Sequence, residues 1–95
     1  MDAVYQERGS GMITVKLFGL LRLDSGIKIM KLEAESLRAL HPLVLKEITK
    51  ARPDTEITEA VIKDCIVVVN GKRVRPNTKL RDGDEVVYLS PGAGG

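Results

Sequence analysis

Few side chains in this sequence combine in a pattern that supports catalysis. Cys65 is the single cysteine and His41 the single histidine among the 95 residues, so the two alone cannot build a metal cluster. Cys65 has no neighbouring base and opens an apolar run, which favours a buried thiol over a nucleophile. His41 falls within a helical pattern, and we expect it on the surface or at the cap of that helix. The sequence contains no phosphate-binding loop, dinucleotide fingerprint or catalytic dyad.

Two further stretches, near the end of the chain, have unusual composition. The acids of Asp82-Gly83-Asp84-Glu85 are candidate cation ligands, but their spacing does not match a calcium loop, so a solvated turn is the better interpretation. The chain then ends in SPGAGG, residues 90–95. Glycine fixes no conformation and packs nothing, so composition alone favours a frayed terminus.

Composition excludes several classes of protein. A chain of 95 residues makes one small domain. Lys and Arg number 15 against 13 acids, and the only aromatic residues are Tyr5, Phe18 and Tyr88, so we expect no nucleic-acid partner. No apolar run is long enough for a membrane span or a signal peptide, and one cysteine makes no internal disulfide. We therefore expect a cytoplasmic protein with no membrane partner.

Hydrophobic periodicity predicts a small α+β domain. Alternating or continuous apolar runs predict five strands, at residues 12–19, 27–33, 65–69, 72–74 and 85–90. The continuous run 65–69 is typical of a strand covered on both faces, and Asp24-Ser25-Gly26 predicts a turn in the loop between the first two strands. The third and fourth of these strands are joined by Asn70-Gly71, which is a strong hairpin signal. Helical spacing predicts a helix that ends near Arg52, and Ser36 is a candidate cap for its start, which stays open. Pro42 either kinks this helix or opens its main part after a separate first turn.

The same patterns divide the chain into three parts. Residues 1–11 are polar and Gly-rich and are predicted to be a disordered leader. Residues 12–90 form the domain, with one helix on one face of a mixed sheet and a polar connector, residues 53–64, that holds one short helical turn. Residues 91–95 form a flexible tail.

The last strand is apolar on both faces, and one helix covers only one face of a sheet. Val87 and Leu89 alternate with Val86 and Tyr88, and Phe18 lies on the polar side of the first strand. Two interpretations stay open. Either an apolar patch is exposed for a partner, or the connector closes the outer face of the sheet.

Three motifs together resemble a known family. VKLFGLLR, VVNGKRV and LRDGDEVVYLSPGAGG are similar to the first strand, the Asn-Gly hairpin and the C-terminal signature of the ubiquitin-like sulfur carriers. The chain is most similar to MoaD, the small subunit of molybdopterin synthase, and next to the ThiS-type carriers. The resemblance covers residues 12–95 and implies the β-grasp fold, with the first and last strands adjacent and parallel.

The resemblance also implies a chemistry. The Gly95 carboxylate would be adenylated by a MoeB-like enzyme, similar to ubiquitin-activating enzymes, that uses ATP and Mg²⁺; the carrier itself holds no cofactor tightly. A persulfide donor would then supply sulfur, giving a thiocarboxylate. The tail, Pro91, Gly92, Ala93 and Gly94, would thread into a MoaE-like large subunit that makes molybdenum or tungsten cofactor. The chain would thus be a substrate-carrying subunit and not an enzyme.

The family's partner surface maps onto Phe18, Leu89 and Arg73. Arg73 departs from the family pattern because it is not apolar, Gly92 makes the tail looser than a second proline would, and Pro42 is unusual within the helix. Three alternatives remain: a carrier for thiazole synthesis, a ubiquitin-like modifier that is joined to lysines, and a plain binding module.

Overall fold

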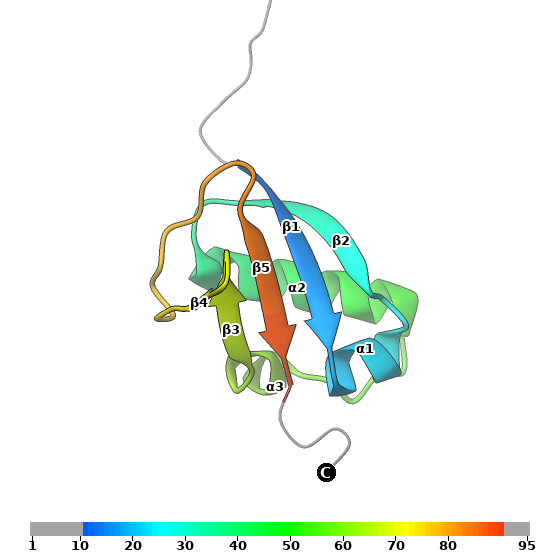
Figure 1. Ribbon diagram of the computed structural model, residues 1–95. Helices are drawn as coiled ribbons and strands as arrows, with labels where there is room; N and C mark the ends of the chain where they lie inside the picture. Colours follow the sequence, from blue (N-terminus) through cyan, green and yellow to red (C-terminus); the bar gives the residue numbers. More distant parts are fainter. Residues whose placement is uncertain (1–10, 91–95) are drawn as a thin grey trace, which may run out of the picture.

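A computed structural model describes residues 11–90, which form one five-stranded sheet with helices on one side (Figure 1). The strand order is β2-β1-β5-β3-β4. The strands and helices, in chain order, are β1 (Gly11–Phe18), α1 (Leu20–Ser25), β2 (Ile29–Ala34), α2 (Leu37–Ala51), α3 (Glu59–Lys63), β3 (Ile66–Val69), β4 (Lys72–Arg73) and β5 (Glu85–Leu89). β1 and β5 are parallel neighbours, and the other neighbouring strands are antiparallel. The predicted α+β class, and the predicted pairing of the first and last strands, are confirmed.

The core lies between the sheet and α2, which crosses behind the sheet in Figure 1. Alternate residues of β1 and β5 point toward α2 because side chains of a strand alternate between its faces. The residues that are fully buried in this layer include Ile13, Val15, Leu17, Leu40, Val44, Ile48, Val86 and Tyr88. We call this side of the sheet the helix face and the other side the open face. Among residues 11–90, no helix covers the open face (Figure 1).

The main helix forms much as predicted. The Ser36 side chain accepts a hydrogen bond from Ala39 N at 3.1 Å, and the helix ends at Ala51, one residue before the predicted end. Pro42 lies inside one continuous helix and does not separate a first turn from the rest. Because proline has no N–H, the carbonyl of Arg38 loses the intrahelical donor that position 42 would otherwise supply.

Other elements differ from the prediction. Residues 20–25 form helix α1, where the sequence indicated only a loop and a turn; the helix ends at Gly26, whose φ of 77° suits glycine. The short turn predicted in the connector is α3, capped by Thr58. The prediction that residues 65–69 are covered on both faces is wrong, because Ile66 is 40% exposed on the open face.

Strand β1 begins one residue before the predicted start of the domain. Gly11 pairs with Ala34, and a Cβ built on Gly11 would lie 2.1 Å from the backbone nitrogen of Asp82. Glycine is needed there because the turn before β5 packs directly against it. The rest of the predicted leader and the whole predicted tail lie outside the described residues. No helix in residues 11–90 has the length and apolarity that a membrane crossing requires.

Candidate functional site

A row of three large apolar side chains crosses the open face at the end of β5. Phe18 pairs with Leu89 across β1 and β5, and Leu89 pairs with Ile66 across β5 and β3. Paired residues of neighbouring strands point to the same face, so the three side chains are neighbours. They are 39%, 37% and 40% exposed, respectively. We call Phe18, Leu89 and Ile66 the apolar row.

A second line of side chains borders the apolar row. Val87 lies between Val68 and Lys16 on the open face, and both valines are half-buried. Lys16 forms an ion pair with Glu85 at 2.8 Å, which places charge on the far side of the valines. The open face therefore changes from apolar to charged along β5.

The structure brings two of the three predicted partner-surface residues together. Phe18 and Leu89 are direct neighbours, whereas Arg73 pairs with Val68 at the edge of the sheet, in the second line. Ile66 completes the row instead, and sequence analysis missed it because residues 65–69 were read as buried. The signal that was missed is the register of β3 against β5. Because Val67 and Val69 of β3 face α2, Ile66 must point to the open face. The alternative in which the connector covers the open face is wrong, because the apolar row is exposed.

The chain leaves β5 beside helix α1. The Ser90 hydroxyl oxygen accepts a hydrogen bond from the backbone N–H of Leu20 at 2.8 Å. Gly19 precedes α1 and has no side chain to cap it, so Ser90 caps α1 from a position 70 residues later. This contact holds the start of the C-terminal segment next to the apolar row. Leu20 and Leu23 add exposed apolar area on α1, at 42% and 76%.

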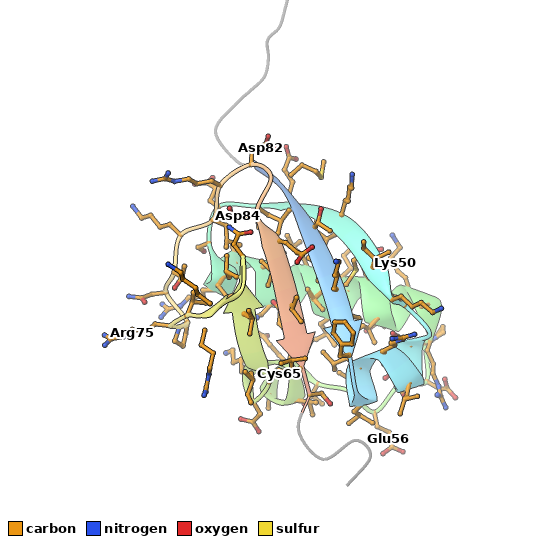
Figure 2. All side chains as sticks on the ribbon, viewed as in Figure 1. Lys50, Glu56, Cys65, Arg75, Asp82 and Asp84 are labelled. Atoms are coloured by element: carbon orange, nitrogen blue, oxygen red, sulfur yellow. The ribbon has the colours of Figure 1, made fainter. Side chains whose placement is uncertain are left out.

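The opposite end of β5 is tied by polar contacts. Asp84 accepts hydrogen bonds from Arg81 N and from Asn70 Nδ2, at 2.8 and 2.9 Å. Asn70 Oδ1 accepts from Glu85 N, and Asp82 Oδ1 accepts from Met12 N, both at 2.9 Å. We call these contacts the polar latch; Figure 2 shows Asp82 and Asp84 at this end of the sheet and Cys65 near the other end. Asp82 and Asp84 thus accept hydrogen bonds from backbone N–H groups and from the Asn70 amide. Within residues 11–90, no group of acidic, histidine and cysteine side chains is placed to hold a metal ion.

The single cysteine is a buried thiol, as predicted. Cys65 is 8% exposed, and its Sγ donates to Val61 O at 3.4 Å. Burial, with a smaller effect of the Asp64 carboxylate, raises the pKa of the Cys65 thiol to about 11. The thiol therefore stays protonated at neutral pH and is a poor nucleophile.

The single histidine is not where the sequence predicted. His41 is 5% exposed and lies on the buried face of α2, not on the solvent-exposed surface of the helix or at its cap. Its Nδ1 lies 2.8 Å from the hydroxyl of Tyr88, which is fully buried. Burial lowers the pKa of His41, with opposing smaller effects of Glu59 and Lys63. Burial likewise raises the pKa of Tyr88, so both groups are neutral near pH 7.

The described residues thus present an exposed apolar row at the end of β5 and no catalytic constellation. The residues predicted to carry the chemistry, Pro91, Gly92, Ala93, Gly94 and Gly95, lie outside the described part of the chain. Ser90, the last described residue, directly follows Leu89 of the apolar row and contacts Leu20.

Comparisons with known proteins identify the family and the fold. The model of the ThiS family matches residues 15–95. No curated protein sequence matches the chain. Among solved structures, the chain is similar to a protein described as molybdopterin converting factor subunit 1 from Pyrococcus furiosus, with 26% identity, a TM-score of 0.65, and coverage of 86% of this chain and 99% of that one.

Two further solved structures share the fold at lower identity. One is a complex of subunits 1 and 2 of molybdopterin-converting factor from Helicobacter pylori, with 24% identity, a TM-score of 0.58, and coverage of 88% of this chain and 99% of that one. The other is small archaeal modifier protein 1 from Methanosarcina acetivorans, with 24% identity, a TM-score of 0.63, and coverage of 90% and 98%. These likenesses confirm the predicted ubiquitin-like β-grasp fold.

Proposed function

This chain belongs to the ThiS family, and we propose that it is a sulfur carrier whose Gly95 carboxylate is adenylated, converted to a thiocarboxylate and used in molybdopterin synthesis. The family membership supports carriage, because the match extends through Gly95. The observation that carries the proposal is the exposed apolar row next to Ser90, where the C-terminal segment begins. A partner that binds this row lies within reach of the segment.

The proposed chemistry activates a poor electrophile. A Gly95 carboxylate oxygen attacks the α-phosphorus of ATP, held with Mg²⁺ by a MoeB-like adenylating enzyme, and pyrophosphate leaves. The outer sulfur of a persulfide donor then attacks the acyl carbon, and AMP leaves with the electrons of the broken C–O bond. A second thiol attacks the donor-side sulfur of the resulting acyl disulfide, so the thiocarboxylate leaves and the donor is left as a disulfide. The product carries sulfur in place of one carboxylate oxygen. The carrier supplies no catalytic group and holds no cofactor tightly.

The types of the tail residues fit this use. Gly95 has no Cβ beside the acyl carbon, so a nucleophile approaches it freely, and Gly94 lets the backbone pass through a narrow channel. Pro91 restricts φ and lowers the entropy that is lost on threading, which offsets part of the freedom that Gly92 and Ala93 retain. Residues 91–95 reach at most ~17 Å when fully extended. That length brings Gly95 into a neighbouring active site while the domain stays outside.

The proposed acceptor is a MoaE-like large subunit. Similarity to molybdopterin converting factor subunit 1 supports this choice, as does the solved complex of subunits 1 and 2 from Helicobacter pylori. We propose that the large subunit and the adenylating enzyme bind the apolar row in turn. Arg73 lies at the edge of the same face and would contact the rim of either partner.

A second candidate function is protein modification. Similarity to a small archaeal modifier protein favours it, because the same acyl adenylate also reacts with a lysine amine. Membership of the ThiS family equally keeps open a carrier role in thiazole synthesis, which shares the first two steps.

A reconstitution with partners from the same host tests the proposal. The chain, the adenylating enzyme, ATP, Mg²⁺ and a sulfur donor are combined, and the large subunit with the pterin precursor is then added. We expect sulfuration of the pterin, and no sulfuration with a variant that carries one extra residue after Gly95. Thiocarboxylate that reaches only a thiazole synthase, or stable adducts on lysines without pterin sulfuration, would overturn the molybdopterin assignment.

A further inference from the structure

Cationic side chains are concentrated in residues 71–81, which include strand β4 at one edge of the sheet. Between residues 71 and 81 five side chains are cationic and none is acidic, namely Lys72, Arg73, Arg75, Lys79 and Arg81. Figure 2 shows Arg75 projecting outward from the loop that follows β4. The structure places this loop beside α2 and α3, because Pro76 lines a hollow together with Arg38 and Lys63.

Two adjoining hollows lie beneath this loop. One, of about 380 Å³, is lined by Arg38, His41, Lys63 and Pro76. The other, of about 170 Å³, shares three of these residues and adds Arg73 and Asp64 to its lining. The larger hollow is in the size range of small-molecule sites.

The charge around the hollows is predominantly positive. Arg38 and Arg73 form no ion pair with any residue between 11 and 90, and Lys63 contacts Glu59 at 3.6 Å through a solvent-exposed pair. Asp64 is the single carboxylate in the lining of either hollow. Three cations therefore face one acid across a concave surface, which favours an anionic ligand.

The buried histidine indicates where such a ligand would be held. The Tyr88 hydroxyl is fully buried, and within the described part of the chain His41 Nδ1 is its one hydrogen-bond partner. A buried O–H group donates to the acceptor that it has, so Nδ1 accepts, and the proton of the neutral ring is on Nε2. That N–H has no acceptor among residues 11–90, although the ring is 5% exposed and lines both hollows.

We propose that these hollows bind a phosphate-bearing small ligand, whose phosphate oxygens accept hydrogen bonds from His41 Nε2–H and from the side chains of Arg38 and Lys63. A phosphate oxygen that enters the hollow supplies an acceptor for the Nε2–H group, which no residue between 11 and 90 provides. Guanidinium and ammonium groups favour a phosphate over a neutral molecule, and a tetrahedral phosphate accepts from several donors at once. Arg73 borders the adjoining hollow and widens the positive rim.

The larger hollow contains no residue of the apolar row, whereas the smaller hollow is also lined by Ile66 of that row and by Arg73. Tyr88, which orients the histidine, faces α2, whereas its neighbour Leu89 faces the open side of β5. Loss of phosphate binding and loss of sulfur carriage are therefore distinguishable in one set of variants.

A titration followed by NMR tests the proposal with the whole chain. Inorganic phosphate and AMP are added separately at constant ionic strength set with chloride, and the His41 ring and the Arg38 and Lys63 side-chain signals are observed. We expect saturable shifts with phosphate or with AMP that chloride does not produce. Tighter binding of AMP would identify an organic phosphate as the ligand, and equal binding would identify the phosphate group alone; either result supports the site.

Matched variants complete the test. Arg38→Ala and Lys63→Ala are exposed changes, and each should weaken binding roughly tenfold or more, while Lys31→Ala, on strand β2 at the opposite edge of the sheet, should leave it unchanged. Shifts that do not saturate, that chloride reproduces, or that persist in both Arg38→Ala and Lys63→Ala would overturn the proposal. A normal unfolding temperature in each variant shows that the fold is intact.

Discussion

The two ends of strand β5 are built in opposite ways. At the start of the strand, the polar latch joins Asp82 and Asp84 to β1 and to Asn70 through hydrogen bonds of 2.8 to 2.9 Å. At the other end, Leu89 lies 37% exposed in the apolar row, and Ser90 makes one hydrogen bond to Leu20. At the first end, the polar groups form hydrogen bonds within the domain. At the second end, apolar side chains remain exposed, where a partner protein can bind.

This difference assigns different consequences to mutations at the two ends. Changes in the polar latch should alter stability and spare partner binding in the folded fraction. Changes in the apolar row should alter partner binding and spare stability, because these side chains are already partly in water. Four predictions test or sharpen this contrast, from the largest expected effect to the smallest.

Asn70→Ala should lower the free energy of unfolding by about 3 kcal/mol, since it removes two hydrogen bonds and places alanine at positive φ. Asn70 has φ of 51°, donates to Asp84 and accepts from Glu85 N. Asn70→Gly removes the same bonds without backbone strain and should cost less. Chemical denaturation measures both, and equal stability of Asn70→Ala and the natural protein would show that the latch is not structural.

Phe18→Asp should weaken partner binding by about 2 kcal/mol, roughly 30-fold, because a charge replaces an apolar contact at the centre of the interface. Met12→Asp is the matched control, since Met12 is 46% exposed on the same face of the same strand but at the latch end. Calorimetry with the large subunit or the adenylating enzyme measures both variants. Equal losses in the two would mean that the open face acts as a whole and that the apolar row has no special role.

The buried histidine predicts a further, smaller effect on stability at mildly acidic pH. Burial lowers the folded-state pKa of His41 below 6.5, so the unfolded chain takes up a proton at a higher pH than the folded chain does. The contribution of neutral His41 to the free energy of unfolding should therefore be fully present above about pH 6.5. It should decline as the pH falls toward the folded-state pKa of His41. Denaturation curves between pH 8 and the range where carboxylates titrate measure the decline. His41→Asn should lack this component, and an identical decline in that variant would assign it to other groups.

Ser90→Ala should have the smallest effect, about 0.5 kcal/mol on stability, because the Leu20 N–H that Ser90 meets is accessible to water. The carrier's transfer reaction should show a KM several-fold higher and an unchanged kcat, since the segment would leave the sheet in a less defined direction. Leu20→Pro removes the same N–H at a helix position that tolerates proline, and Leu20→Ala controls for the lost side chain. If Ser90→Ala still raises KM in the Leu20→Pro background, the hydrogen bond is not the cause.

Much of the fold could be predicted from local patterns. Strand alternation and the Asn-Gly hairpin are local signals, and with helical spacing they located β1, β2, β5 and the end of α2. The start of α2 stayed open because Pro42 allowed two interpretations. Helix α1 was missed because it is six residues long and lacks a cap of its own; the side chain that caps it comes from Ser90. A contact 70 residues distant leaves no trace in local sequence.

The contact surface was predictable only in part, for the same reason. Phe18 and Leu89 were identified from strand alternation and from the resemblance, but Ile66 required the register of β3 against β5. His41 was misplaced because helical periodicity does not show how closely Tyr88 approaches from the sheet. Tertiary contacts decided each of these positions.

Mass spectrometry of the intact protein from its native host tests sulfur carriage most directly. We predict a fraction of molecules in which sulfur replaces one oxygen of the Gly95 carboxyl group, located by fragmentation to the last residue, and rising when ATP, the cognate adenylating enzyme and a sulfur donor are added. A chain that never carries this sulfur, even with the cognate enzyme, ATP and donor present, would contradict the account.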